Sequence, residues 1–311
     1  MTRRLLRGDV ERAAAAIRRG GLVAMPTETV YGLAADATDP AAIARIFEVK
    51  GRPSDHPLIV HLADPDDLDR WAPDASGDAR ALAALAWPGP LTLLVPRGER
   101  LPADVAGGRA TVGLRVPAHP MARELIRLAG VPLAAPSANR FGAVSPTTAD
   151  HVVRDLGELL DPELDVVLDG GACPVGVEST IVDTTVEPVQ VLRAGAVTAA
   201  QVAGVVEGGR VAAAAGPARA SGMLASHYAP RCEVRLVDHA DDAAALAAGT
   251  RRSRVLDLTD DVARYARELY AELRRADDDG VGTLVAVLPP ADGLGHAIRD
   301  RLAKAAAPRP R

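Results

Sequence analysis

The stretch from Leu91 to Val116, LTLLVPRGERLPADVAGGRATVGLRV, holds two β-rich runs with no helical pattern between them. The runs are Leu91–Val95 and Thr111–Val116, and their content of Leu, Val and Thr is typical of strands. Parallel neighbours need a long crossover, usually a helix, whereas antiparallel neighbours do not. The stretch therefore predicts a mixed sheet in an α/β domain.

Short strands and helices alternate on either side of this stretch. Further strands are predicted at Leu22–Met25, Leu58–Leu62, Asp165–Asp169 and Ser179–Thr184. Helical periodicity is found at 9–19, 40–50, 76–86, 119–129 and 147–156. Together these elements predict one twisted α/β domain with a mixed sheet over residues 1–205.

The composition changes after this domain. Residues 206–231 are dominated by Gly, Ala, Pro and Arg without periodicity, which predicts a linker far longer than the usual ~4–6 residues. Beyond it, three strands alternate with three helices, which predicts a smaller, Rossmann-like α/β domain with a parallel sheet over residues 232–311. Its strands are expected at Glu233–Val237, Arg254–Leu258 and Thr283–Leu288, and its helices at 241–248, 261–276 and 294–307.

The overall composition restricts the class of protein. The 311 residues fit two domains. No run of ~18 apolar residues occurs and arginines interrupt the N-terminal segment, so we expect neither a membrane span nor a secretory signal. Two cysteines, Cys173 and Cys232, are too few for a disulfide framework, which favours a reducing compartment such as the cytoplasm. The net charge of −5 argues against a nucleic-acid backbone as the main ligand.

Lysine and asparagine are rare in this chain. The 36 Lys plus Arg residues include two lysines, Lys50 and Lys304, and Asn139 is the single asparagine. A residue that persists against such a bias is a candidate for chemistry that its usual substitute cannot perform. Lys304 lies in a polar final helix, where we expect a solvated side chain. Lys50 and Asn139 lie in unusual local sequences.

Four polar clusters follow predicted strands or helices, and each also has a purely structural interpretation. Pro26–Gly32 (PTETVYG) offers two hydroxyls and a carboxylate for a ligand, or is a Thr-rich turn. Lys50, with Gly51 as the helix stop, offers a point charge for a phosphate, or only complements the helix dipole. Arg115 interrupts an apolar strand and is either aimed at an anion or snorkels at an edge. The loop Pro136–Asn139 offers hydroxyl, amide and N–H groups, or is an Asx-type turn.

Two more clusters lie further along the chain. One is Gly176–Asp183 (GVESTIVD), followed by Arg193, and the other is Ser226–Pro230 (SHYAP) inside the linker. No P-loop, G-x-G-x-x-G or nucleophile-elbow pattern occurs, so a nucleotide would have to bind on a less common scaffold. A zinc site from His56 and His61 is disfavoured because no further ligand pattern accompanies them.

In this order, the six clusters resemble the threonylcarbamoyl-AMP synthase family, in the long form with a YrdC-like catalytic domain and a C-terminal accessory domain. The resemblance extends from about residue 10 to residue 307. The most specific pieces are PTETVYGL, KGRPSDHPLIVH, WPGPLTLLV, PSAN with SPT, GVESTIVD and SHYAP. Two later stretches, ARELYAELRRADDDGV and GHAIRDRLAKAA, are similar to the accessory domain.

The resemblance implies that L-threonine, bicarbonate and ATP, with Mg²⁺, yield threonylcarbamoyl-AMP and pyrophosphate, and that a tRNA threonylcarbamoyl transferase consumes the product. The implied threonine-binding residues are Thr29, His61, Arg115 and Ser179. The implied ATP-binding residues are Lys50, Arg52, His56, Thr111, Ser137, Asn139, Ser145, Arg193 and Tyr228. Lys50, Arg52 and Arg115 are the implied catalytic residues, and no protein-held metal is implied. Two positions depart from the family pattern, His56 where many relatives have Asn and Ala194 where Pro is common.

The chemistry suits these residue types. Displacement at phosphorus needs positioning and charge neutralisation more than acid–base work, and the clusters supply cations and hydroxyls without an evident base. Carbamate is short-lived in water, so we expect a closed cavity, with Tyr228 on a linker that acts as a lid. The alternative is that Tyr228 only packs between the two domains.

Other functions were weighed against this one. An RNA-binding module is disfavoured by the acidic balance and the 3% aromatic content. A regulatory module that binds nucleotide without turnover stays open. A hydrogenase-maturation carbamoyltransferase needs Cys-rich zinc segments, which two cysteines exclude.

Overall fold

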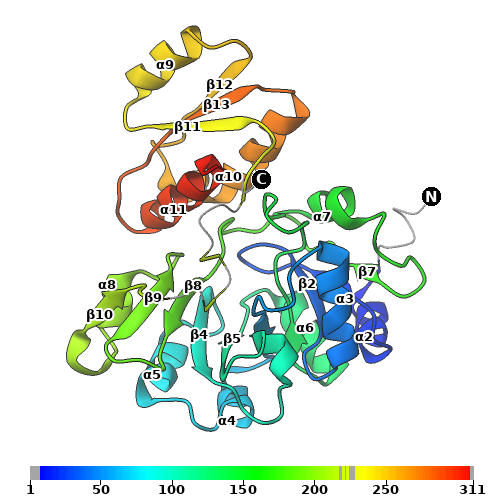
Figure 1. The fold of residues 1–311 in the computed structure, drawn as a ribbon. Coiled ribbons are helices and arrows are strands. Elements are labelled where there is room, and N and C mark those ends of the chain that lie inside the picture. The colour runs from blue at the N-terminus through cyan, green and yellow to red at the C-terminus, as the bar shows by residue number, and fades with distance from the viewer. Residues whose placement is uncertain (1–7, 217–218, 221, 224–227, 309–311) are drawn as a thin grey trace.

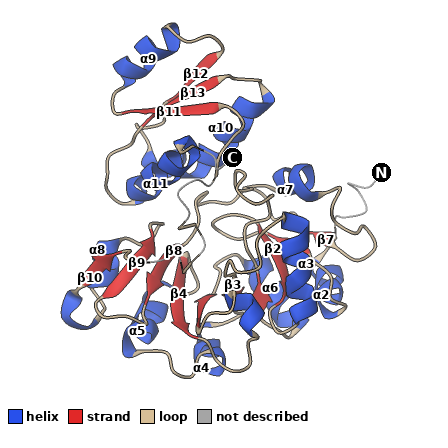
Figure 2. Cartoon of the chain, in the orientation of Figure 1, coloured by secondary structure: helices blue, strands red, loops and turns tan. Residues whose placement is uncertain are grey.

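The computed structural model describes residues 8–216, 219–220, 222–223 and 228–308. These residues form two domains, each with its own sheet (Figure 1). The larger domain has a ten-stranded sheet and the smaller one a three-stranded sheet. Helices cover both sheets, as expected of α/β domains (Figure 2).

The ten-stranded sheet is mixed, as predicted. Its strand order is β10-β9-β8-β4-β5-β3-β6-β2-β1-β7. The consecutive strands β4 and β5 pair antiparallel, with Leu93 opposite Leu114, and β5 pairs parallel with β3 on its other side. The strand bounds are β1 Val23–Met25, β2 Gly32–Asp36, β3 Ile59–His61, β4 Leu91–Pro96, β5 Thr111–Arg115, β6 Leu133–Ala134, β7 Val166–Val167, β8 Thr180–Asp183, β9 Val189–Arg193 and β10 Val211–Ala213.

The helices of this domain begin and end where the sequence places capping residues. The side chain of Asp39 accepts a hydrogen bond from the N–H of Ala41, Pro40 occupies the first helical position, and Gly51 ends the helix in a left-handed conformation. The helix bounds are α2 Val10–Arg18, α3 Pro40–Lys50, α4 Leu68–Trp71, α5 Gly77–Ala86, α6 Pro120–Ala129, α7 Ala149–Leu156 and α8 Ala199–Ala203. Three short 3₁₀ turns lie at η1 Pro65–Asp67, η2 Ala103–Ala106 and η3 Glu207–Gly209.

Four strands and two helices of the larger domain were not predicted, namely β2, β6, β9, β10, α4 and α8. Strands β6 and β10 have two and three residues, too few to show an alternating pattern. Strand β10 also lies within the segment expected to be a linker. It pairs parallel with β9, Val211 opposite Val189, so the irregular part of that segment starts only after Ala213.

The smaller domain has the predicted parallel sheet, in the order β11-β13-β12. Side chains on the central strand alternate between two faces. Leu284 and Ala286 pack in the cluster formed with α10 and α11, whereas Val285 and Val287 pack against the opposite helix, α9. The bounds are β11 Glu233–Val237, α9 Ala240–Ala248, β12 Ser253–Leu256, α10 Val262–Asp278, β13 Thr283–Val287 and α11 Leu294–Ala306.

Helices α10 and α11 lie between the small sheet and the larger domain (Figure 1). The guanidinium of Arg274, on α10, donates to both carboxylate oxygens of Asp155 and to the carbonyl oxygen of Val144. Gly176 makes a close approach possible, because a Cβ there would lie 2.4 Å from the carbonyl oxygen of Ala266. The two domains are therefore joined by a buried ion pair and by direct backbone contact.

We expect Arg274→Met to lower the free energy of unfolding by about 3 kcal/mol, because it leaves a mostly buried Asp155 carboxylate without its cation. The measurement is urea denaturation followed by circular dichroism. Arg154→Ala is the matched control. It breaks a second pair between the same domains, Arg154 with Asp278, whose side chains are 45% and 46% exposed, so the loss should stay below about 1 kcal/mol. Equal losses in the two variants would contradict the assignment of Arg274 as the stronger contact.

Candidate active site

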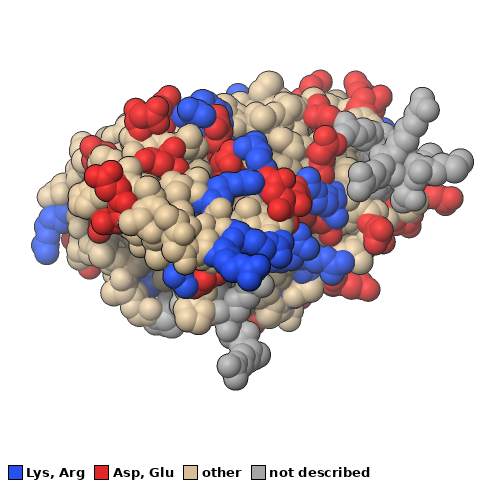
Figure 3. All heavy atoms as spheres, turned by 90° about the horizontal axis from the view of Figure 1, so that it is seen from above, with Lys and Arg blue, Asp and Glu red and all other residues tan. Residues whose placement is uncertain are grey.

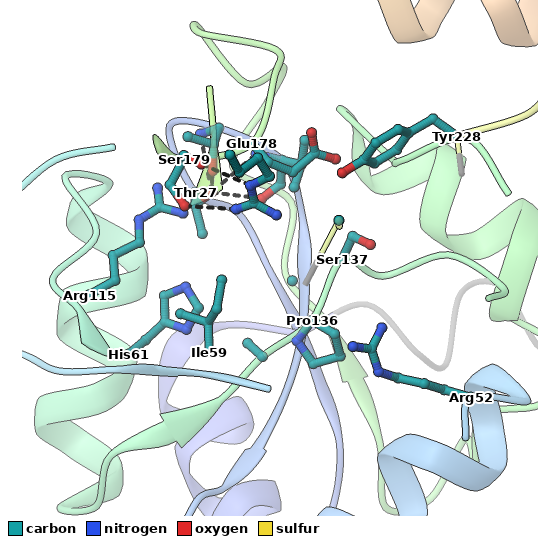
Figure 4. Close-up of a pocket in the computed structure, with 16 residues that line it drawn as sticks. Thr27, Arg52, Ile59, His61, Arg115, Pro136, Ser137, Glu178, Ser179 and Tyr228 are labelled. Atoms are coloured by element: carbon teal, nitrogen blue, oxygen red, sulfur yellow. Dashed lines mark hydrogen bonds between the residues drawn. The ribbon is translucent and has the colours of Figure 1, made fainter. Parts of the chain in front are cut away.

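A pocket forms in the larger domain where several strands end close together (Figure 4). It has about 560 Å³ of free space, part of it open to solvent. Its lining comes from the β1–β2 turn, the end of α3, strands β3 and β5, the loop after β6, the segment before β8, the end of β9 and the segment between the domains. The lining residues are Thr27, Thr29, Val30, Gly32, Arg52, Ile59, His61, Arg115, Ala135, Pro136, Ser137, Glu178, Ser179, Arg193, Gly222 and Tyr228.

His61 and Arg115 are neighbours because β3 and β5 pair in parallel and put these two residues opposite each other. Burial, together with the adjacent Arg115 cation, lowers the pKa of His61 to about 3, so the imidazole is neutral near pH 7. The Arg115 side chain is held from two directions. Its Nε donates to the carbonyl oxygen of Gly89, and its Nη2 lies 2.6 Å from a carboxylate oxygen of Glu28. A neutral imidazole beside a fixed guanidinium is suited to a small ligand that carries a carboxylate.

The β1–β2 turn presents threonine hydroxyls to the pocket. The Thr27 hydroxyl donates to the carbonyl oxygen of Val30 and accepts from the N–H groups of Thr29 and Val30. The Thr27 and Thr29 hydroxyl oxygens lie 2.9 Å apart. The cluster is thus the Thr-rich turn of the structural interpretation and also part of the pocket wall.

Ser179 is the centre of a second polar group. Arg193 Nε donates to the Ser179 carbonyl oxygen at 2.9 Å, and Arg193 Nη2 donates to the Ser179 hydroxyl at 3.0 Å. The Thr92 and Ser179 hydroxyls lie 2.8 Å apart. Burial lowers the pKa of Arg193, which nonetheless keeps its charge at neutral pH.

Lys50 is buried against the loop that contains the single asparagine. Its ammonium donates to the carbonyl oxygens of Ser137 and Asn139. Burial, followed by repulsion from Arg52, holds the Lys50 pKa well below its ordinary value. The Asn139 amide donates to the carbonyl oxygens of Arg140 and Ala143. Lys50 and Asn139 therefore shape the loop on which Ser137 is presented.

The structure brings together eight of the thirteen predicted site residues at the pocket wall. They are Thr29, Arg52, His61, Arg115, Ser137, Ser179, Arg193 and Tyr228. The other five, Lys50, His56, Thr111, Asn139 and Ser145, do not line it. His56 packs edge-on against Phe141, with ring centroids 5.2 Å apart. Thr111 starts β5, and Arg115 ends it, so the two are separated by about 13 Å of extended strand.

Ser145 has a contact that leads to residues the sequence interpretation missed. Its hydroxyl donates to Glu178 Oε1 at 2.6 Å. Glu178 lines the pocket, and its other oxygen accepts from Tyr270 and Arg301 of the smaller domain. The sequence signal for Glu178 was its position inside the GVESTIVD cluster, and it was not among the predicted site residues. The two partners lie in stretches quoted for the accessory domain, and nothing in their local sequence indicates a contact with the pocket.

Tyr228 reaches the pocket from the segment between the domains (Figure 4). Only 1% of its surface is exposed, and its backbone adopts a left-handed conformation that a bulky residue rarely takes. Its ring lies 5.6 Å from the ring of Tyr270 and 5.3 Å from the guanidinium of Arg301. Its neighbours Ser226 and His227 fall outside the described residues.

Lys304 was expected to be solvated, and this expectation is wrong. Its ammonium donates to the carbonyl oxygen of Gly222 at 2.6 Å and to Asp300 at 2.9 Å. Gly222 itself lines the pocket. Helix α11 therefore contacts the segment between the domains at Gly222.

Within residues 8–216, 219–220, 222–223 and 228–308, no three His, Cys, Asp or Glu side chains are grouped so as to hold a metal ion. The described helices include none that is both long and apolar enough to cross a membrane. On the face seen in Figure 3, Lys and Arg side chains lie beside Asp and Glu side chains.

The fold and the pocket define a two-domain α/β protein, with a cation-rich pocket in the larger domain and a smaller domain whose Tyr270 and Arg301 bond to the pocket residue Glu178. Comparison with known proteins identifies the family. The family model described as "Telomere recombination", for Sua5, YciO and YrdC, matches residues 15–195. The model for the threonylcarbamoyl-AMP synthase C-terminal domain matches residues 197–307. The chain belongs to the threonylcarbamoyl-AMP synthase family, in its two-domain form.

Individual relatives agree over nearly the whole chain. Threonylcarbamoyl-AMP synthase of Pyrococcus abyssi is 40% identical, over 94% of this chain and 92% of that protein. The Bacillus subtilis enzyme of the same name is 36% identical, over 96% of this chain and 93% of that protein. The crystal structure of P. abyssi Sua5 complexed with L-threonine superimposes with a TM-score of 0.88 at 39% identity, covering 96% of this chain and 94% of that one.

We expect Lys50→Arg to reduce turnover at least about tenfold while the protein stays folded. The larger, planar guanidinium cannot replace an ammonium enclosed by two carbonyl oxygens, so the Ser137 loop must shift. The measurement is steady-state turnover, with circular dichroism as the test of folding. Arg80→Lys, at an exposed ion pair, is the control and should keep wild-type turnover. Wild-type turnover in Lys50→Arg would show that Lys50 only complements the helix end.

Proposed function

We propose that this protein is an L-threonylcarbamoyladenylate synthase, which converts L-threonine, bicarbonate and ATP into threonylcarbamoyl-AMP and pyrophosphate. The observation that carries the proposal is the convergence of three guanidinium groups, from Arg52, Arg115 and Arg193, on one pocket that also presents hydroxyls. Three cations in one partly enclosed space suit substrates that carry a carboxylate, a carbamate and a triphosphate. The relatives named threonylcarbamoyl-AMP synthase support the same reading.

Threonine fits at the end of the pocket formed by β3 and β5. Its carboxylate would pair with Arg115, which Glu28 and the Gly89 carbonyl hold in place. Its hydroxyl would form hydrogen bonds with the neutral His61 imidazole and with the Thr29 and Ser179 hydroxyls, which can donate or accept. Ile59, also in the lining, offers an apolar surface to the methyl group.

The nucleotide would occupy the other end of the pocket, between Arg52, the Ser137 loop and Arg193. A carbamate oxygen attacks the α-phosphorus, the bond from that phosphorus to the bridging oxygen breaks, and pyrophosphate leaves. The reaction needs alignment and neutralisation of charge, and it transfers no proton in the displacement step. Fixed guanidinium groups supply both, because their geometry is set before the substrates bind.

Magnesium fits as part of the Mg·ATP substrate. Glu178 is the one carboxylate among the described lining residues, and both of its oxygens already accept hydrogen bonds. The ion would therefore keep its phosphate and water ligands, as Mg²⁺ commonly does in such sites.

The segment between the domains would exclude water from the carbamate. Tyr228 and Gly222 close one side of the pocket, and α11 holds Gly222 through Lys304. Release of that contact would open the side through which substrates and product pass. Because the product is an activated acyl adenylate, a tRNA threonylcarbamoyl transferase would have to take it up promptly, and we place both proteins in the cytoplasm.

We expect pyrophosphate release only when threonine, bicarbonate and Mg·ATP are all present. The measurement is a coupled pyrophosphate assay in which each substrate is omitted in turn. Serine in place of threonine should give a severalfold lower kcat/KM, because it lacks a methyl group worth ~1 kcal/mol in an apolar contact. Release that continues without threonine would overturn the proposed function. A regulatory module would bind ATP and release no pyrophosphate under any combination.

Arg115→Ala should raise the threonine KM by roughly 10- to 100-fold, since a charge-assisted hydrogen bond is worth about 1.5–3 kcal/mol. The KM for ATP should change much less, because Arg115 lies at the β3–β5 end of the pocket. Arg80→Ala serves as the control for loss of an arginine and should leave both constants unchanged. An unaltered threonine KM in Arg115→Ala would remove Arg115 from the threonine site.

A further inference from the structure

Glu178 is a carboxylate in a pocket whose other described lining residues are cations and neutral groups. It is 6% exposed. Its Oε1 accepts from the Ser145 hydroxyl at 2.6 Å, and its Oε2 accepts from Tyr270 at 2.7 Å and from Arg301 Nε at 2.8 Å. An anion at this place is unexpected, because it would repel the phosphates of a nucleotide.

Arg301 supplies the compensating charge from the other domain. It lies on α11, has no exposed surface, and is the largest fully buried side chain among the described residues. Besides Glu178, it donates to the Ala194 carbonyl oxygen at 3.0 Å and pairs with Asp300. Both terminal nitrogens of the guanidinium are thus held. Nη2 bonds to Ala194, directly after β9, and Nη1 bonds to Asp300 on α11.

Other charged and titratable groups around Glu178 come from every element packed against it. Arg193 approaches from β9, Tyr270 from α10, and Tyr228 from the segment between the domains. Burial alone would raise the Glu178 pKa, but Arg301 first and then Arg193, helped by the Arg301 and Ser145 hydrogen bonds, lower the pKa to about 2. Glu178 is therefore ionised throughout the physiological range, and Arg301 makes the largest contribution to compensating its charge.

The position of Glu178 in the chain gives this pair a further consequence. Ser179, the next residue, lines the pocket and is bonded to Arg193. The same Arg301 guanidinium packs over the Tyr228 ring at 5.3 Å. One side chain of the accessory domain thus bonds to the carboxylate that precedes Ser179 and packs over a tyrosine of the pocket wall.

We propose that Arg301 is a positioning residue of the active site, which cancels the charge of Glu178 so that the accessory domain determines how tightly the pocket binds the nucleotide. The proposal rests on the proposed function, because it takes ATP as the ligand. Its physical basis is that a buried carboxylate without its cation opposes an incoming polyanion, whereas a neutral group of the same shape does not. Removing Glu178 should therefore repair the loss of Arg301.

The test compares four forms of the full-length chain: wild type, Arg301→Met, Glu178→Gln and the double variant. ATP binding is measured by isothermal titration calorimetry, and the KM values for ATP and threonine by pyrophosphate release. Arg301→Met should weaken ATP binding at least about tenfold at pH 8, with a smaller change in the threonine KM. The double variant should bind ATP within about threefold of wild type. Glu178→Gln alone should bind ATP at least as tightly as wild type.

A pH series separates charge compensation from mere packing. In Arg301→Met the largest opposition to the burial effect is lost, and only Arg193 and the Ser145 hydrogen bond remain. The Glu178 pKa should therefore rise, and lowering the pH from 8 to 6 should protonate part of the Glu178 population and strengthen ATP binding. Wild type and the double variant should show no such recovery, because Arg301 lowers the Glu178 pKa to about 2 in wild type and the double variant has no carboxylate at position 178. Arg154→Ala, at the exposed pair with Asp278, is the matched control for an interdomain contact and should bind ATP like wild type.

Two results would overturn the inference. One is a double variant that binds ATP no better than Arg301→Met, and the other is a Glu178→Gln variant with weakened ATP binding. The second needs no Arg301 variant, so the test holds even if Arg301→Met fails to fold. Failure of the proposed function looks different, because wild type itself would then release no pyrophosphate whatever the state of Glu178.

Discussion

The parallel pairing of β3 with β5 is the constraint on which the active site depends. It places His61 opposite Arg115, so that a neutral imidazole and a guanidinium share one wall of the pocket. Strand β5 is also antiparallel to β4, which is in turn parallel to β8. This alternation carries the Ser179 segment to the same end of the sheet as His61, because parallel strands finish together and antiparallel strands reverse.

Buried charge is the second recurring theme, and each buried ion has a defined partner. Arg115 has Glu28, Arg193 has the Ser179 hydroxyl and carbonyl, and Glu178 has Arg301. Unpaired ions in such places would cost several kcal/mol each. The partners also hold the cations at fixed positions, which is what an enzyme that works by alignment requires. The same bonds thus stabilise the fold and order the site.

The accessory domain contacts the wall of the active site in this arrangement, although none of its described residues lines the pocket. Its α10 and α11 face the catalytic domain, and from them Tyr270 and Arg301 reach the Glu178 carboxylate while Lys304 holds Gly222. A domain attached only by a flexible tether would make none of these contacts. Motion of the small domain would therefore alter the charge and the closure of the pocket together.

The helices were predictable because local residues start and stop them: Asp39, Pro40 and Gly51 bound α3 without help from the rest of the chain. The mixed sheet followed from two strands with no helix between them, and the family followed from motifs whose order is linear. The same linear motifs contain the eight predicted site residues that lie at the pocket. The short strands β6 and β10 exist only through their partners, so no local pattern marks them. Only the tertiary structure decided that Glu178 and Arg301, 123 residues apart, form one buried pair, because burial and Coulomb attraction depend on distance in space and not on separation along the chain.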